Sequence, residues 1–220
     1  MINEKLATVK KNIPSNVTLV AVSKTKPNEL IEEAYKAGQR IFGENKAQEL
    51  KNKAEVLPKD IQWHFIGHLQ RNKVKYIAPH TSLIHSIDSI QLLTEVNKQG
   101  LKNNRIIDCL LQFHIATEES KFGLSLEEAT ELLNSNDFLN LKNIKIVGVM
   151  GMASFINNEE QVRNEFIRLK DIFTQLNNNF FKKTETFQTI SMGMSGDYQI
   201  AIEEGSTMIR VGSAIFGNRN

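Results

Sequence analysis

Short apolar runs alternate with amphipathic stretches along the chain. The first run, residues 17–24, is rich in β-branched and aliphatic residues, which is typical of a buried strand. Pro27 then ends the extended segment and suits the first turn of a helix over residues 28–34. The same alternation predicts further strands over residues 39–43, 61–66, 82–87, 105–115, 144–150, 186–190 and 207–211.

Amphipathic segments separate these strands. A short helix over residues 2–12 precedes the first strand, with Ile2, Leu6 and Val9 on one face. The remaining helices are predicted over residues 45–57, from about 69 to Pro79, and over 89–99, 126–133, 158–176 and 196–203.

Eight strands that alternate with helices in 220 residues predict an α/β protein, a single (β/α)8 TIM barrel with an extra N-terminal helix. A doubly wound open sheet is the alternative, because strands are difficult to count from one sequence. No low-complexity linker or break in composition divides the chain. We therefore expect residues 1–220 to form one domain.

Composition narrows the class of protein. The 27 basic and 25 acidic residues nearly balance, which argues against a nucleic-acid binder with a concentrated basic face. The sequence has no secretion signal and no apolar stretch near the ~18 residues of a membrane span, so we expect a soluble, cytoplasmic protein. Its one cysteine, Cys109, excludes an intramolecular disulfide and lies in an apolar stretch, which favours a packed thiol.

Lys24 is the residue that this pattern leaves unexplained. A cation at the end of an apolar strand is costly to bury unless it is neutralised or paired. One interpretation is a lysine with a lowered pKa whose free amine forms a Schiff base; the other is a solvated lysine on a surface loop. Because strand residues alternate, Lys24 shares a face with Val20 and Val22, and in a barrel it would point toward the mouth, where active groups gather.

Two loops rich in glycine and serine follow the last two predicted strands. Residues 191–198 lead from the seventh strand into a helix, and residues 210–217 follow the eighth. Small residues let the backbone approach a ligand closely, and the loops after strands seven and eight form the usual phosphate site of such barrels. With Lys24 at the first strand, they predict an amine that faces a phosphate site.

Several segments resemble the pyridoxal phosphate homeostasis protein family, in the same order and across nearly the whole chain. They are residues 20–24, 42–45, 63–70, 85–89, 191–197 and 210–217. The resemblance implies a fold similar to the N-terminal barrel of alanine racemase. It also implies that pyridoxal 5′-phosphate is carried as an internal aldimine on Lys24, without a reaction of the protein's own, so that the protein maintains the cellular pool of this cofactor.

The resemblance also implies the other cofactor-binding residues. Arg210 is expected to face the pyridine nitrogen, and Asn45 to lie near the ring. The residues expected around the phosphate are Ser191, Gly193, Ser195, Gly212 and Ser213.

A Schiff-base enzyme, either an amino-acid racemase or a lyase acting on a phosphorylated sugar, is the alternative function. Racemisation needs a second acid/base group opposite the lysine. In alanine racemase this group is a tyrosine from a further domain of a partner subunit, whereas this sequence ends about where the barrel is expected to end. Of its three tyrosines, Tyr35 and Tyr76 fall within predicted helices. We therefore favour a carrier, expected to act as a monomer with apo-enzymes that use the cofactor as transient partners.

Other residues invite weaker hypotheses. His64, His68 and His85 have no carboxylate or cysteine at ligand spacing, so we expect no metal site, and His64 and His85 are interpreted as packed barrel histidines. Lys26 and Lys121 are either solvated lysines or part of a second cofactor site, and the sequence leaves this open.

Overall fold

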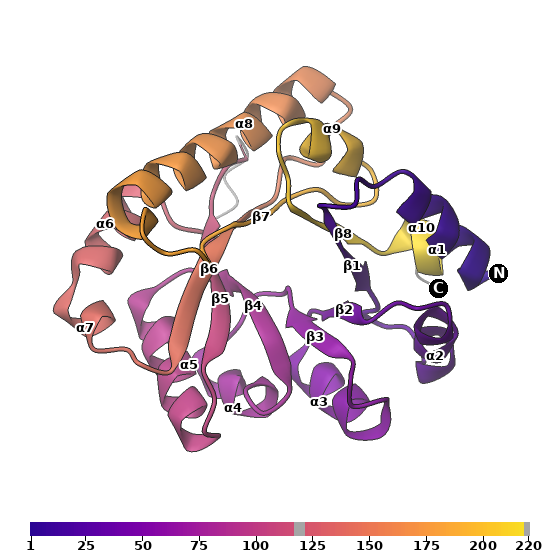
Figure 1. Ribbon diagram of the computed structural model, residues 1–220, viewed down its shortest axis with the longest axis horizontal. Coiled ribbons are helices and arrows are strands. Elements are labelled where there is room, and N and C mark those ends of the chain that lie inside the picture. The colour runs from indigo at the N-terminus through magenta and orange to yellow at the C-terminus, as the bar shows by residue number, and fades with distance from the viewer. Residues whose placement is uncertain (117–121, 218–220) are drawn as a thin grey trace.

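Eight parallel strands close into a barrel in the computed structural model, which describes residues 1–116 and 122–217 (Figure 1). Each strand pairs with the next, and the last pairs with the first. The barrel confirms the predicted fold class and excludes the open sheet. The strands are β1 (Thr18–Val22), β2 (Ile41–Glu44), β3 (Gln62–Phe65), β4 (Thr81–Ile87), β5 (Ile107–Phe113), β6 (Ile144–Gly151), β7 (Thr189–Ser191) and β8 (Met208–Val211).

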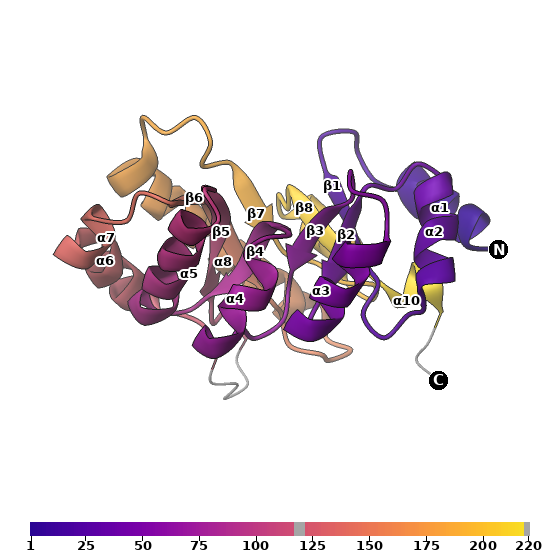
Figure 2. The ribbon, with the colours of Figure 1, turned by 90° about the horizontal axis from the view of Figure 1, so that it is seen from below.

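Helices surround the barrel on its outside (Figures 1 and 2). They are α1 (Ile2–Lys11), α2 (Asn28–Lys36), α3 (Ala47–Val56), α4 (Val74–Ile77), α5 (Ile90–Lys102), α6 (Leu126–Asn134), α7 (Asn136–Leu139), α8 (Glu159–Leu176), α9 (Tyr198–Glu203) and α10 (Ser213–Phe216). A 3-10 turn, η1 (Arg71–Lys73), precedes α4, and a π-helical turn, η2 (Asn177–Phe181), extends α8. Within the described residues, no helix is long and apolar enough to cross a membrane.

Local sequence accounts for several helix boundaries. Ser125 caps α6 through a capping box with Glu128, and Asn158 accepts a hydrogen bond from the Gln161 N–H at the start of α8. The helix predicted from about residue 69 is shorter than expected, because η1 begins only at Arg71. The chain that leaves β3 is pressed against the β2 loop: a Cβ on Gly67 would lie 2.3 Å from the Asn45 carbonyl oxygen.

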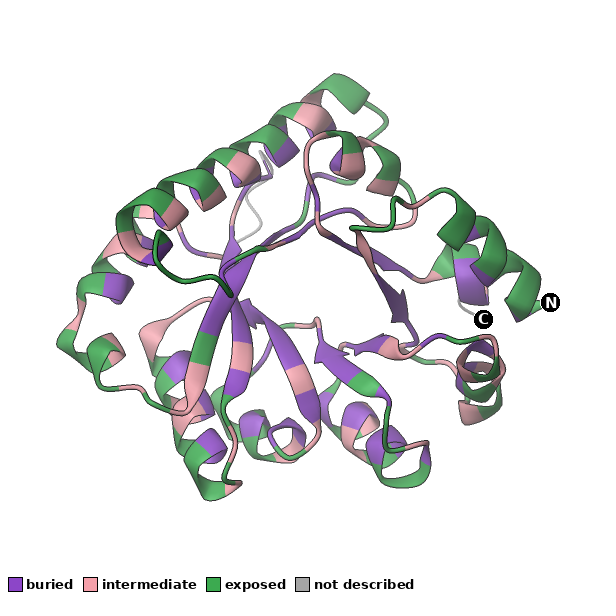
Figure 3. Ribbon diagram, viewed as in Figure 1, coloured by how far each residue is buried: buried purple, intermediate pink, exposed green. Residues whose placement is uncertain are grey.

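The strands separate two apolar regions. The larger one fills the space between the sheet and the helices and includes Leu19 and Ala21 of β1. The smaller one lies inside the barrel and consists of Val20, Leu83, Leu110, Val147, Met150 and Met208. Figure 3 shows the resulting pattern, with largely buried strands and helices that are buried on one side only. Val20 therefore faces the interior and its neighbours face the helices, as the alternation predicted.

Cys109 is fully buried on β5, and burial raises its thiol pKa above the ordinary value. The predicted packed thiol is confirmed.

One close backbone contact joins β6 to β7. Gly148 pairs with Thr189 and has φ +155°, and a Cβ there would lie 1.9 Å from the Thr189 carbonyl oxygen. The space required for such an atom is taken by backbone, which cannot move aside as a flexible side chain can. Only glycine fits this position.

We therefore expect Gly148→Ala to lower the free energy of unfolding by about 3 kcal/mol or more, because overpacking forces two strands apart. Urea denaturation measures this loss. Gly196→Ala is the matched control, because Gly196 has no heavy atom within 4 Å of the added Cβ. Equal stabilities of the two variants would contradict the expectation.

Candidate functional site

Lys24 lies in a turn at the carboxyl end of β1. The strand ends at Val22, Ser23 is fully buried, and the half-buried Lys24 follows in the turn. The Lys26 N–H donates to the Ser23 carbonyl oxygen at 3.0 Å and closes this turn. Thr25 has φ +65°, in the left-handed region that β-branched residues rarely adopt. The predicted strand ended at Lys24, whereas the observed strand ends at Val22 and Lys24 lies in the turn that follows.

The loop after β8 passes directly beside this turn. Ala21 of β1 pairs with Val211 of β8, and Gly212 follows. A Cβ on Gly212 would lie 3.2 Å from both the Cβ and the carbonyl oxygen of Val22, so the loop packs closely against the end of β1. Ser213 is exposed as the first residue of α10. The barrel therefore brings the Lys24 turn and the Gly212 loop together.

The loops after β7 and β8 are joined to each other. Gly193 has φ +97°, and a Cβ there would lie 2.7 Å from the Ala201 Cβ of α9. Its carbonyl oxygen accepts a hydrogen bond from the Arg210 N–H at 2.9 Å. The Gly212 N–H donates to the Ser195 hydroxyl at 3.1 Å. Gly193 is thus required by its backbone conformation and close packing, Gly212 is closely packed, and Ser195 links the two loops.

Arg210 is buried inside the barrel and fixed by hydrogen bonds. Its guanidinium donates to the Ser191 carbonyl oxygen at 2.9 Å, to the Ser191 hydroxyl at 2.6 Å and to the Gly151 carbonyl oxygen at 3.0 Å. Burial lowers the Arg210 pKa to about 10, while the Asp197 carboxylate raises it. The side chain is therefore a cation at neutral pH.

Two histidines extend this arrangement across the barrel. His85 Nδ1 lies 3.0 Å from the Ser191 hydroxyl, and His85 Nε2 lies 3.0 Å from His64 Nδ1. Burial lowers the His64 pKa to about 3 and holds the His85 pKa well below its usual value, so both rings are neutral. The interpretation as packed barrel histidines is confirmed. The Ser191 hydroxyl contacts Arg210 and His85, and its expected place at the phosphate stays a prediction.

Asn45 follows β2 at the same end of the barrel and is half-buried. Its Oδ1 is buried, and no described residue gives it a hydrogen bond. A buried acceptor of this kind is rare in folded proteins and asks for a partner.

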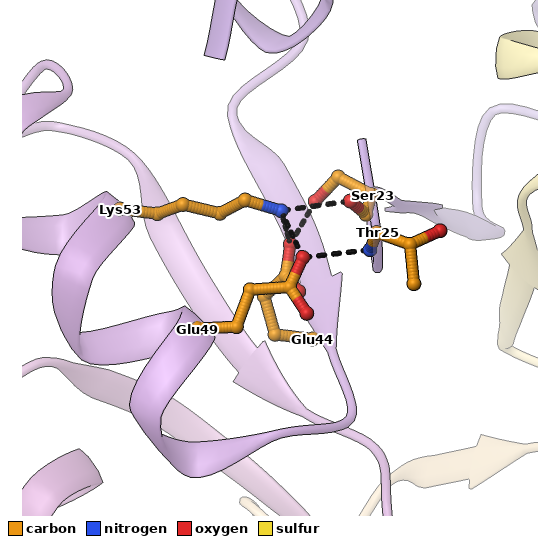
Figure 4. Close-up of polar contacts among 5 residues, drawn as sticks. All are labelled: Ser23, Thr25, Glu44, Glu49 and Lys53. Atoms are coloured by element: carbon orange, nitrogen blue, oxygen red, sulfur yellow. Dashed lines mark hydrogen bonds and ion pairs between the residues drawn. The ribbon is translucent and has the colours of Figure 1, made fainter. Parts of the chain in front are cut away.

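Sequence reasoning missed a buried group of charges beneath the Lys24 turn, which we call the Lys53 cluster (Glu44, Glu49 and Lys53; Figure 4). Lys53 Nζ donates to Glu44 Oε1 at 2.8 Å, to Glu49 Oε1 at 2.7 Å and to the Ser23 carbonyl oxygen at 2.9 Å. The Ser23 hydroxyl donates to Glu44 Oε1 at 2.6 Å, and the Thr25 N–H donates to Glu49 Oε1 at 2.6 Å.

A signal for this cluster was present in the sequence. Lys53 lies on the buried face of α3 with Leu50, and Glu49 stands four residues before it at the spacing of a helical ion pair. A lysine on an apolar helix face needs a partner. Glu44 at the end of β2 is that partner, and only the fold places it there.

The remaining candidate residues are Lys26, Lys121 and His68. Lys26 is half-buried in the turn that follows Lys24, and Lys121 falls outside the described residues. His68 is half-exposed, with Nδ1 3.7 Å from Asp88 Oδ2. Within the described part of the chain, no group of three histidine, cysteine or acidic residues is placed to hold a metal ion.

Comparisons with known proteins identify relatives of this chain. A family model described as "Alanine racemase, N-terminal domain" matches residues 1–220. A protein of Aquifex aeolicus named "Pyridoxal phosphate homeostasis protein" is 40% identical over 202 residues, which are 91% of this chain and 86% of that protein.

Solved structures agree on the fold. PipY of Synechococcus elongatus, in its structure with PLP bound, is 33% identical, with a TM-score of 0.87 over 99% of this chain and 100% of that chain. The alanine racemase of Bartonella henselae, with covalently bound pyridoxal phosphate, is 17% identical, with a TM-score of 0.74. It matches 99% of this chain but 58% of its own, and at this identity it shows the fold alone.

The Lys53 cluster gives a pH dependence that can be measured. Burial raises the Glu44 pKa to about 7, against the opposing effects of Lys53 and the Ser23 hydroxyl. A carboxyl with a raised pKa in the folded state contributes stability that is fully present below its unfolded value of 4.5 and is lost as the pH rises through about 7.

We therefore expect wild type to lose about 2 to 3 kcal/mol of stability relative to Glu44→Gln between pH 5 and pH 8, from about 1.4 kcal/mol per pKa unit. Urea denaturation of both proteins at the two pH values measures this difference and cancels the contributions of other groups. Glu55→Gln, at the exposed ion pair with Lys51 on the same helix, is the control with little effect at either pH. A difference between wild type and Glu44→Gln that does not change with pH would refute the assignment.

Proposed function

Because the chain belongs to the alanine racemase N-terminal domain family, as the resemblance of its motifs indicated, we propose that it binds pyridoxal 5′-phosphate through Lys24 and acts as a carrier of this cofactor without a reaction of its own. The observation that carries the proposal is the adjacency of the Lys24 turn and the Gly212 loop at the β1–β8 seam. A ligand with an aldehyde at one end and a phosphate at the other would find its two partners at the ends of these neighbouring strands.

The residues of the site fit this cofactor. Its phosphate needs a backbone without bulky side chains beside it, and Gly193 and Gly212 supply such backbone in the loops after β7 and β8. Ser195 and Ser213 add hydroxyls at the same loops. The buried Asn45 Oδ1, to which no described residue donates a hydrogen bond, is an acceptor at the same end of the barrel.

When bound, pyridoxal phosphate supplies an aldehyde that condenses with a lysine amine. Lys24 provides that amine in its neutral form. The glycine-rich loops would hold the phosphate through backbone N–H groups and hydroxyls, and would thereby keep the aldehyde beside the Lys24 turn.

The charge of Arg210 bears on whether the site supports catalysis with this cofactor. Its guanidinium stays protonated at neutral pH and is fixed by Ser191 and Gly151. Placed against the pyridine nitrogen, as the family resemblance implies, this cation would disfavour a proton there and would weaken the ring as an electron sink, which carbanion chemistry with this cofactor requires. The site is therefore suited to hold the cofactor rather than to turn over a substrate.

The names of the relatives support the same role. The Aquifex protein is named for pyridoxal phosphate homeostasis, and PipY was solved with PLP bound. We propose that this protein works in the cytoplasm as a monomer of one domain and passes the cofactor to apo-enzymes by transient contact. Its matched relatives have nearly its own length, whereas the alanine racemases are much longer.

Borohydride reduction after incubation with pyridoxal phosphate is expected to leave a pyridoxyl group on Lys24, detected by peptide mass mapping. Lys24→Ala is expected to lose this adduct and the visible absorbance of the bound cofactor, because the reacting amine is gone. Lys26→Ala, two residues along the same turn, is the matched control and keeps both.

An adduct on other lysines only, or full absorbance in Lys24→Ala, would disprove the assignment of Lys24. The carrier role has its own test on the same protein. Sustained Cα exchange of amino acids in deuterated water at enzymatic rates would favour a racemase instead. A colourless protein that cleaves sugar phosphates would favour a lyase.

Sedimentation velocity, followed at the visible absorbance of the cofactor, tests the carrier and the monomer together. The loaded protein alone is expected to sediment as one species of about 25.0 kDa. After an apo-enzyme that uses the cofactor is added, the absorbance is expected to move to the boundary of that enzyme without a stable complex. Absorbance that stays with the carrier after the apo-enzyme is added contradicts the transfer of the cofactor. A species larger than 25.0 kDa in the loaded protein alone contradicts the monomer.

A further inference from the structure

The Lys53 cluster holds the backbone on both sides of Lys24 (Figure 4). The peptide group before Lys24 contains the Ser23 carbonyl, which accepts a hydrogen bond from Lys53 Nζ at 2.9 Å. The peptide group after Lys24 contains the Thr25 N–H, which donates to Glu49 Oε1 at 2.6 Å. Both peptide planes that meet at the Lys24 Cα are therefore attached to side chains of α3.

These two attachments define the direction in which the Lys24 side chain leaves the backbone. The orientation of the Cα–Cβ bond of a residue follows from the two peptide planes beside it. With both planes fixed, the side chain of Lys24 starts from one defined direction at the mouth of the barrel. Lys53 and Glu49 are also bonded to each other at 2.7 Å, so the two attachments form one rigid unit.

Stability alone does not explain this arrangement. Lys53 is 6% exposed and Glu44 is fully buried, and buried ion pairs of this kind are often no more stable than apolar residues of similar volume. Thr25 is held at φ +65°, a conformation that costs free energy in a threonine. A strained turn beside a buried charge cluster is instead typical of a functional constraint.

We propose that Lys53 and Glu49 are positioning residues that aim the Lys24 amine at the loops after β7 and β8 and thereby set how fast it condenses with an aldehyde. The inference rests on the proposed function of Lys24 as the cofactor lysine. Neither residue is assigned contact with the cofactor: both act through the backbone of Ser23 and Thr25.

Two pairs of variants separate positioning from a merely structural role. Lys53→Met removes the donor to Ser23, and Lys53→Arg restores N–H donors and a positive charge. Glu49→Ala removes the acceptor for Thr25, and Glu49→Gln restores an amide oxygen in its place. Lys51→Met is the matched control, because Lys51 lies on the same helix and pairs with Glu55 on the solvent-exposed surface, at 3.6 Å.

The measurement is the rate of pyridoxyl incorporation at Lys24 as a function of pH, with pyridoxal phosphate as the probe and borohydride as the trap, together with the melting temperature of each variant. We expect Lys53→Met and Glu49→Ala to slow incorporation by about tenfold or more, as small displacements of a reacting group do. The pH profile is expected to change shape with them. Lys53→Arg and Glu49→Gln are expected to recover most of the rate, and Lys51→Met to match wild type.

The outcomes distinguish this proposal from the one on which it rests. If wild type carries no adduct on Lys24, the proposed function fails and the positioning role fails with it. If wild type is labelled and folded Lys53→Met and Glu49→Ala are labelled at the same rate with the same pH profile, only the positioning role is overturned. If Lys53→Met does not fold, Glu49→Ala decides alone, because the Glu49 side chain is 21% exposed and its loss leaves Lys53 paired with Glu44.

Discussion

The pairing of β8 with β1 is the interaction on which the site depends. Four register pairs, from Thr18 with Met208 to Ala21 with Val211, join the two ends of the chain. The seam satisfies the backbone groups of what would otherwise be two open edges. It also places the Lys24 turn against the Gly212 loop, although the two are far apart in the sequence. Closure of the sheet and assembly of the site are thus one event, and a chain that fails to close has neither.

The barrel supports this seam with different chemistry inside and outside. Its interior has an apolar layer that includes Val20 and Met208, and a polar group in which Ser191 joins Arg210 to His85. Outside the barrel wall, the Lys53 cluster ties α3 to the turn after β1. The backbone beside Lys24 and the Arg210 guanidinium are therefore held from opposite sides of the sheet by separate sets of hydrogen bonds.

Periodicity was sufficient to predict the barrel and the place of Lys24, because strand alternation and loop position are local properties of a sequence. The inward direction of Val20 follows from the same local signal. The partners of the buried polar groups were not predictable. Ser191 meets His85 across 106 positions only because a closed sheet brings distant residues together. Glu44 and Lys53 are only nine positions apart, but they meet because α3 packs back against the end of β2.

The row from Arg210 through Ser191 and His85 to His64 has a consequence for how a charge is solvated in a dry interior. When the Ser191 hydroxyl, which accepts from Arg210, donates its own hydrogen to His85 Nδ1, His85 Nε2–H in turn donates to His64 Nδ1. Each dipole then points its negative end toward the guanidinium. Reversal of the row needs a hydroxyl rotation and a change of tautomer in both histidines, with every heavy atom in place. The barrel interior thus surrounds the buried Arg210 guanidinium with dipoles that can reorient toward a new charge beside it while every heavy atom stays in place.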